Sequence, residues 1–182
     1  MKKKVLVILA DGFEEIEAIV PIDVLKRAEL DVVLAGLNGK EVTGSHGLRV
    51  HVDILLSEYR DLPDAVILPG GLPGAKHLEE SEPVLVLLKR MNQQKKLVGA
   101  ICASPAFALT RSGILKGRKA TCYPGFERRF SKETTFLEDR VVIDQNITTS
   151  RGPGSALEFA LALVEQLVSK EKAQSLQEAL LA

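Results

Sequence analysis

The first candidate for covalent chemistry is Cys102, which stands between the apolar run 97–101 and the pair Ser104-Pro105. The run predicts a buried strand, and Ser104 as N-cap with Pro105 at the first helical position predicts a helix. A side chain on such a turn is held at the carboxyl edge of a sheet, as in the nucleophile elbow of hydrolases. Backbone N–H groups and the helix start should favour a thiolate. The alternative is a structural cysteine, since free cysteines are often buried.

A cysteine nucleophile needs a group that manages its proton, and three glutamates follow the first apolar run: Glu14, Glu15 and Glu17. A carboxyl group beside a thiolate has its pKa raised by desolvation and by like charge, so it can stay protonated and relay a proton. Each glutamate could instead be solvated, as most are. The spacing alone does not choose among the three.

The loop 69–74 reads PGGLPG and has enough glycine for a close backbone approach to the cysteine. Its N–H groups at Gly70 and Gly71, together with the N–H of Ala103, are candidate oxyanion donors. Gly71 and Ala103 are the natural pair for this role. The expected site therefore combines one thiol, one carboxyl group and two or three backbone donors.

Apolar runs suited to buried strands alternate with helical segments along the whole chain. The predicted strands cover 4–10, 31–37, 64–68, 97–102, 119–122, 140–144 and 146–150, with a hairpin arm or edge strand at 48–54. The predicted helices cover 14–28, 82–94, 105–111, 155–169 and 172–181. The pattern favours an α/β fold with a mostly parallel sheet, helices on both faces, and a single domain over 1–182.

Ligands of open parallel sheets bind outside the carboxyl ends of the strands. Four loops leave such ends in the predicted fold, and we expect them to converge: 11–17, 69–74, 102–105 and 150–154. Arg151 lies in the last of them and could line the mouth of the site, where it would neutralise a substrate carboxylate. An ordinary surface ion pair is the alternative for Arg151.

Composition excludes several classes of function. Lysine plus arginine and aspartate plus glutamate number 24 each, and there is no tryptophan, so neither a basic nor a stacking surface for nucleic acid is evident. No apolar run approaches the roughly 20 residues that span a bilayer. Two cysteines form no disulfide framework, and the amino terminus resembles no signal peptide, so we expect a cytoplasmic protein.

The sequence predicts neither a metal nor a cofactor. His46, His51 and His77 are scattered and show no metal-ligand spacing. A flavin or nucleotide module is disfavoured because the acidic loop 11–17 stands where a phosphate would need glycine and N–H groups. Cys122 is expected to be a packing thiol rather than a resolving partner for Cys102.

Four motifs in order resemble the ThiJ/PfpI superfamily, in the branch of the parkinsonism-associated protein deglycase (DJ-one). These are VLVILADGFEEIEAIVPIDVLKRA, VILPGGLPGA, AICASP and TSRGPGSALEFAL, and together they cover nearly the whole chain. The resemblance implies a flavodoxin-like three-layer sandwich and a homodimer. It also implies a low-pKa, readily oxidised cysteine at Cys102 with a protonated glutamate partner at Glu17, and a polar pocket residue near His46.

Two positions depart from the patterns of that superfamily. The protease-like branch has a histidine directly after the cysteine, but this chain has Ala103, which argues against a peptidase. The deglycase branch often has a histidine near the cysteine where this chain has Tyr123. A phenol is a weak base at neutral pH, so either Glu17 makes the proton transfers alone or turnover is slow.

Two functions follow from these residues. The first is a glutathione-independent glyoxalase or deglycase that acts on methylglyoxal or early glycation adducts, with Cys102 as nucleophile and Glu17 as proton relay. The second is a redox sensor or chaperone of the oxidative stress response, in which Cys102 is oxidised to a sulfinate.

Overall fold

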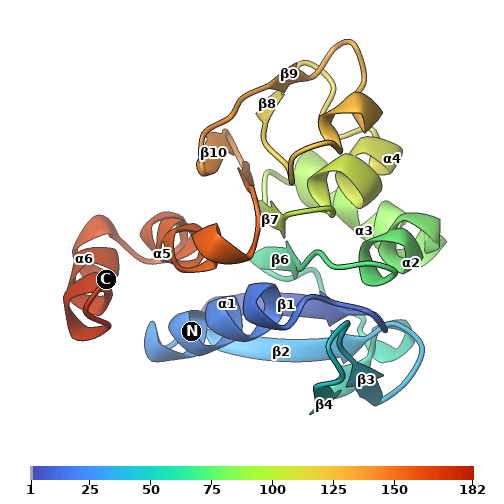
Figure 1. The fold of residues 1–182 in the computed structure, drawn as a ribbon. Coiled ribbons are helices and arrows are strands. Elements are labelled where there is room, and N and C mark those ends of the chain that lie inside the picture. The colour runs from blue at the N-terminus through green and yellow to red at the C-terminus, as the bar shows by residue number, and fades with distance from the viewer. Residues whose placement is uncertain (1) are drawn as a thin grey trace.

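A seven-stranded, mostly parallel sheet forms the centre of the computed structural model, which describes residues 2–182 (Figure 1). Only β10 runs antiparallel to its neighbour. The strand order is β10-β11-β7-β6-β1-β2-β5, and the five central parallel strands follow the order of flavodoxin-like folds. In this order, the strands are β10 (Val141–Asp144), β11 (Ile147–Ser150), β7 (Leu97–Ile101), β6 (Ala65–Leu68), β1 (Lys4–Leu9), β2 (Asp31–Gly36) and β5 (Ile54–Leu55).

The central strands are apolar on both faces because helices cover both faces of the sheet. Along β1, Val5 and Val7 belong to one hydrophobic cluster, whereas Leu6 and Ile8 belong to the other. All four side chains are fully buried. The continuous apolar runs of the sequence thus correspond to strands between two layers of helices, and the predicted three-layer α/β sandwich is confirmed.

The helices divide between the two faces by the cluster into which their apolar side chains pack (Figure 1). One face is covered by α1 (Glu15–Arg27), α5 (Ala156–Leu167) and α6 (Lys170–Ala179). The other is covered mainly by α3 (Glu82–Gln93), with α4 (Thr110–Ser112) packed against it, while α2 (Gly74–Glu80) and the π-helix Pro105–Leu109 contribute side chains to both clusters. The sequence did not predict α2, which begins at the last glycine of the loop 69–74.

Smaller elements lie at the periphery of the sheet. A hairpin of β3 (Glu41–Thr43) and β4 (Arg49–His51) follows β2, and β5 adds an edge strand. The sequence predicted either a hairpin arm or an edge strand at 48–54, and the structure has both: β4 is the hairpin arm and β5 is the edge strand. A parallel pair, β8 (Lys119–Ala120) with β9 (Thr135–Phe136), lies outside the main sheet. The remaining short 3-10 helices are Leu56–Glu58, Glu127–Arg129 and Pro153–Ser155.

The carboxyl ends of β1, β6, β7 and β11 meet at one edge of the sheet, and the expected convergence of the four loops is confirmed. A Cβ built on Gly70 would lie 2.6 Å from both Cys102 Cβ and Glu17 Oε2. A Cβ built on Gly152 would lie 4.0 Å from Glu17 Oε1. No helix within residues 2–182 is long and apolar enough to cross a membrane.

Candidate active site

Cys102 forms a sharp turn directly after β7, where its backbone has a positive φ of 63°. This left-handed conformation costs an ordinary residue about 1–2 kcal/mol. Two backbone hydrogen bonds of 2.9 Å hold it: the Cys102 N–H donates to the Ser150 carbonyl, and the Cys102 carbonyl accepts from the Tyr123 N–H. The strand-to-helix elbow predicted from the sequence is confirmed, and its strain is typical of functional residues.

Ser104 does not cap the following helix, so that prediction is wrong. Its backbone is already helical, with φ −59° and ψ −35°, because the helix begins with a π-turn over Pro105–Leu109. The buried hydroxyl instead donates a hydrogen bond of 2.5 Å to the Pro69 carbonyl. Ser104 therefore joins the cysteine elbow to the glycine-rich loop that follows β6.

Glu17 lies in the first turn of α1 and is completely buried. Its Oε2 accepts a hydrogen bond of 2.8 Å from the Gly70 N–H, and the Cys102 side chain lies beside its carboxyl group. Burial raises the pKa of Glu17 to about 7, with a smaller contribution from the nearby charge of Glu14. Glu17 Oε1 has no hydrogen-bond partner among the described residues. An unpartnered buried oxygen beside a cysteine is free to exchange a proton with a substrate.

Cys102 and Glu17 titrate as a coupled pair. Burial and the neighbouring charge of Glu17 raise the pKa of the Cys102 thiol, whereas the N–H groups of Gly71 and Ala103 lower it by less. The expectation of a low pKa for the Cys102 thiol is therefore wrong when Glu17 is ionised. Desolvation and the like charge of Glu17 then raise this pKa by more than the backbone donors lower it. Protonation of Glu17 removes the like-charge contribution, so a thiolate at Cys102 is favoured more by a neutral than by an ionised carboxyl group.

The three N–H groups predicted as oxyanion donors, those of Gly70, Gly71 and Ala103, have different roles in the structure. The Gly70 N–H is occupied by Glu17, so Gly70 positions the carboxyl group and is not a free oxyanion donor. The N–H groups of Gly71 and Ala103 approach the Cys102 sulfur. Gly71 adopts φ = 87°, a conformation that favours glycine. Only these two of the three candidate donors are available to a group bound at the sulfur.

A small hollow of about 210 Å³ lies at the loop 150–154, where Gly152 separates it from Glu17 of the pair. A Cβ on Gly152 would lie 3.1 Å from the Tyr123 ring and 4.0 Å from Glu17 Oε1, so the absence of a side chain at Gly152 keeps this space open. We call it the Cys102 hollow. Its lining residues are Tyr123, Pro124, Arg140, Arg151 and residues 152–155. Two predicted pocket residues, Tyr123 and Arg151, therefore lie together.

His46 lies at a different place, on the turn of the β3–β4 hairpin. Its ring is exposed, and its Nδ1 lies 2.8 Å from Glu15 Oε2, while its N–H donates to Glu15 Oε1 at 2.6 Å. This pairing raises the pKa of His46 and lowers that of Glu15 to about 2. The role of His46 as a pocket residue stays a prediction.

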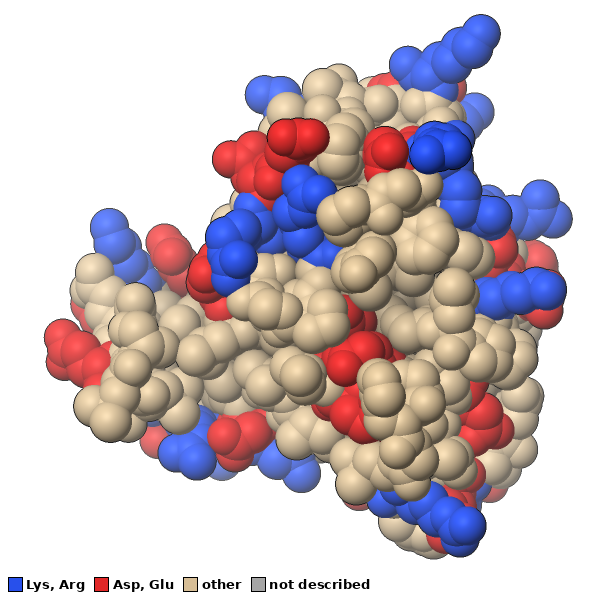
Figure 2. All heavy atoms as spheres, viewed as in Figure 1, with Lys and Arg blue, Asp and Glu red and all other residues tan. Residues whose placement is uncertain are grey.

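Charged side chains gather around this edge of the molecule. Figure 2 shows acidic side chains near the middle of the displayed face and basic ones on the side where β10 lies. Ligand atoms of Glu14, Glu15 and His46 lie within 4.8 Å of one another. However, Glu14 caps α1 by accepting from the Glu17 N–H at 2.8 Å, and Glu15 already binds His46. The Glu14 carboxylate thus caps α1, and the Glu15 carboxylate joins α1 to the β3–β4 hairpin.

Cys122 is completely buried, and burial raises the pKa of its thiol to about 12. A thiol in this environment is a poor nucleophile because little thiolate forms. This agrees with the expected packing role of Cys122. Whether it couples to Cys102 stays an open prediction.

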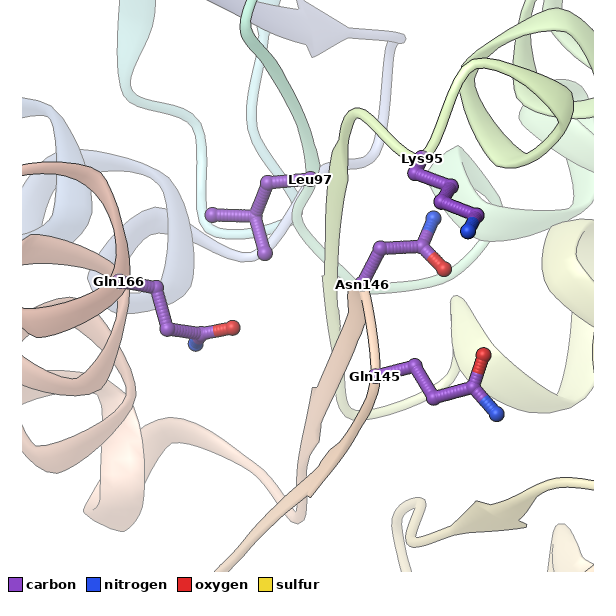
Figure 3. Close-up of a pocket in the computed structure, with 5 residues that line it drawn as sticks. All are labelled: Lys95, Leu97, Gln145, Asn146 and Gln166. Atoms are coloured by element: carbon purple, nitrogen blue, oxygen red, sulfur yellow. The ribbon is translucent and has the colours of Figure 1, made fainter.

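A larger pocket of about 540 Å³ lies at the amino end of β7, opposite the cysteine edge (Figure 3). Its lining residues are Lys95, Leu97, Gln145, Asn146 and Gln166, and we call it the amide pocket. Two of its amides are already used: Asn146 Nδ2 donates to the Lys96 carbonyl, and Gln166 Nε2 donates to Thr148 Oγ1. The lining contains no carboxyl group and no thiol. No pattern in the sequence predicts this pocket.

Residues 3–166 match the model of the DJ-1/PfpI family. The chain belongs to this family. It is 46% identical to the protein DJ-1 homolog B of Arabidopsis thaliana, over 94% of this chain and 40% of that protein. It is 38% identical to the glutathione-independent glyoxalase DJR-1.2 of Caenorhabditis elegans, over 96% of this chain and 94% of that protein.

Among solved structures of the DJ-1/PfpI family, the oxidised DJ-1 of Toxoplasma gondii superimposes with a TM-score of 0.92 at 42% identity. The match covers 98% of both chains. By contrast, the chain spans less than half the length of the two Arabidopsis relatives, DJ-1 homologs A and B. The fold and the family are thus established together, with the predicted membership confirmed.

Proposed function

We propose that the protein is a glutathione-independent glyoxalase or deglycase that acts on methylglyoxal or early glycation adducts. The observation that carries this proposal is the Cys102–Glu17 pair, in which a strained thiol faces a buried carboxyl group with one unpartnered oxygen. The name of the C. elegans relative, a glutathione-independent glyoxalase, supports the same reaction class.

The proposed reaction begins with addition of the Cys102 thiolate to the aldehyde carbon of methylglyoxal. A C–S bond forms, and the resulting oxyanion is stabilised by the Gly71 and Ala103 N–H groups before it takes the proton of Glu17. The Glu17 carboxylate then removes the proton from that carbon, the hydroxyl proton passes to the neighbouring carbonyl oxygen, and Glu17 returns its proton to the carbon of that carbonyl. The product is a thioester of lactate. Water hydrolyses it to lactate and regenerates the thiol.

Glu17 suits both proton transfers because its pKa of about 7 places it between acid and base at neutral pH. Its unpartnered Oε1 faces the Cys102 hollow near Gly152. Tyr123 borders the same hollow and shapes it, while its backbone N–H holds the Cys102 carbonyl. In this scheme Glu17 is the sole proton relay.

A second candidate function is a redox sensor or chaperone working through oxidation of Cys102. One observation favours it: a sulfinate at Cys102 would meet the Gly71 and Ala103 N–H groups and the protonated Glu17 carboxyl. All three are donors to an acid oxygen. Cys122 lacks such a set and is completely buried.

We also propose that the protein acts in the cytoplasm as a homodimer. Ile16 and Ile19 leave half and about two fifths of their surfaces exposed on α1, next to the site. Exposed aliphatic side chains of one helix are suited to contact with a second copy.

The test is lactate formation from methylglyoxal without glutathione, in the wild type and in Cys102→Ser, Glu17→Gln and Cys122→Ser variants. We expect lactate from the wild type and from Cys122→Ser, and at least a 10²-fold loss in the other two. Full activity of Cys102→Ser would overturn the proposal. No lactate from the wild type, with peroxide oxidising Cys102 selectively, would favour the redox sensor.

A further inference from the structure

Two arginines line the Cys102 hollow, Arg140 and Arg151, together with Tyr123. Its lining residues include no carboxyl group. An anionic group in this space is therefore stabilised by the arginine charges, since Coulomb energy depends on the distance to each charge.

The two arginines differ in how far their charges are compensated. The Nε of Arg140 lies 2.9 Å from both carboxylate oxygens of Glu158, so its charge is paired. Arg151 donates from Nη1 to the Glu138 carbonyl at 3.0 Å, and it forms no ion pair within residues 2–182. A guanidinium has five N–H donors, so most of those of Arg151 are open.

Arg151 is also fixed in place by the residues on both sides of it. The preceding Ser150 carbonyl accepts the N–H of Cys102, and the following Gly152 faces Glu17 Oε1 and the Tyr123 ring. The open guanidinium thus belongs to a segment whose backbone contacts the nucleophile. At about 210 Å³, the hollow is smaller than the ~300–1,000 Å³ of sites for drug-sized ligands, and it suits a short-chain compound.

We propose that Arg151 binds a carboxylate of the substrate, so that the site prefers short 2-oxoaldehydes that carry a carboxylate at the other end. This substrate class rests on the proposed function of the same site. The aldehyde carbon lies at the Cys102 sulfur, and the carboxylate lies at the guanidinium. A charge-assisted contact of this kind is stronger than one between neutral groups.

The compound 4,5-dioxopentanoate has this form. Addition of water across its two carbonyl groups, by the steps proposed for methylglyoxal, gives 2-hydroxyglutarate and one proton. The Cys102 sulfur forms and then loses one C–S bond, and no oxidant or reductant is consumed. The neutral comparison substrate is 2-oxopentanal, which has the same number of carbons and lacks the carboxylate.

A test that needs no turnover compares the alkylation of Cys102 by iodoacetate and by iodoacetamide. The two reagents deliver nearly the same group, but only iodoacetate is an anion. We expect the iodoacetate-to-iodoacetamide rate ratio at Cys102 to exceed that of free cysteine by about tenfold, the effect of one charge-assisted contact. High salt should lower this ratio. A wild-type ratio no higher than that of free cysteine would overturn the proposal.

Variants then assign the effect to Arg151. Arg151→Gln should lower the rate ratio about tenfold, and Arg151→Lys should retain part of it. Arg60→Gln is the matched control because it removes one positive charge from a different surface, beside the 3-10 helix Leu56–Glu58 and lined also by Pro83 and Val86. An unchanged ratio in Arg151→Gln, or an equal fall in Arg60→Gln, would contradict the role of Arg151.

Turnover gives the second measurement, as the ratio of kcat/KM for 4,5-dioxopentanoate to that for 2-oxopentanal. We expect the wild-type ratio to be well above one and to fall about tenfold in Arg151→Gln. Failure of the proposed function would appear as no turnover of either compound, with the alkylation ratio still high. Failure of the carboxylate proposal would appear as turnover of both compounds with the same ratio in wild type and Arg151→Gln.

Discussion

Two pockets lie at opposite edges of the sheet, and the smaller one lies next to the reactive groups. The amide pocket is more than twice as large as the Cys102 hollow, at about 540 against about 210 Å³. Yet the lining of the amide pocket contains no thiol and no carboxyl group. Next to the hollow, across Gly152, lies a buried carboxyl group whose pKa is about 7, paired with a cysteine of φ = 63°. Reactivity here follows desolvation and backbone strain rather than volume.

The difference has its origin in the direction of the strands. Parallel strands bring all their carboxyl ends to one edge, and there β6, β7 and β11 deliver the glycine loop, the elbow and Arg151. The amino edge receives mainly returning turns, such as those containing Lys95 and Gln145, each with a positive φ. The following predictions test whether the Cys102 hollow alone carries the chemistry.

The largest effect is expected from Gly70→Ala. A Cβ there would lie 2.6 Å from both Cys102 Cβ and Glu17 Oε2, so the pair must separate. We expect about a 10²-fold loss of kcat/KM, together with destabilisation of about 1–3 kcal/mol. Gly39→Ala is the control, because its Cβ would meet nothing closer than 3.4 Å. Kinetics and urea unfolding measure both quantities, and equal kinetics in the two variants would contradict the prediction.

The pH dependence of stability should reveal the buried carboxyl group. The pKa of Glu17 is about 7 in the folded protein and about 4.5 for an ordinary glutamate. Between these values the folded state binds more protons than the unfolded state, so stability falls as the pH rises from about 4.5 to 7. The expected loss is about 3 kcal/mol. It should be absent from Glu17→Gln, as measured by urea unfolding at several pH values, whereas the same slope in both proteins would refute it.

Ser104→Ala should have an intermediate effect. Its hydroxyl is buried and bonds to the Pro69 carbonyl, and its removal leaves that carbonyl unpaired, which costs about 1–2 kcal/mol. The matched control is Ser112→Ala, since the buried Ser112 hydroxyl donates to the Leu109 carbonyl at 2.8 Å. Both variants should lose stability in thermal unfolding. Only Ser104→Ala should also lower kcat, because only Ser104 holds the elbow against the glycine loop.

The smallest effect is expected in the amide pocket. Gln166→Leu removes the hydrogen bond to Thr148 Oγ1, at a cost of about 1 kcal/mol in unfolding free energy. We expect kcat/KM for methylglyoxal to stay within about twofold of the wild type. A tenfold loss in a folded Gln166→Leu variant would show that the two edges of the sheet are coupled.

The sequence by itself determined the α/β layering and the elbow. Apolar runs such as 4–10 and 64–68 can be buried only between two layers, and the small residues around Cys102 allow the tight turn. Because parallel strands place their carboxyl ends together, the convergence of four distant loops also followed from the element order alone.

Tertiary structure alone decided how the site residues are used. Spacing could not choose among the glutamates, and the family resemblance named Glu17 without a physical reason. Burial supplies that reason, since Glu17 is completely buried while Glu14 caps the helix and Glu15 binds His46. The hydroxyl of Ser104 found a partner across the fold, at Pro69, because the helix begins earlier than a capping pattern predicts. The raised pKa of the Cys102 thiol likewise depends on desolvation and on the charge of Glu17. Such effects come from groups far apart in the chain, and a local pattern does not contain them.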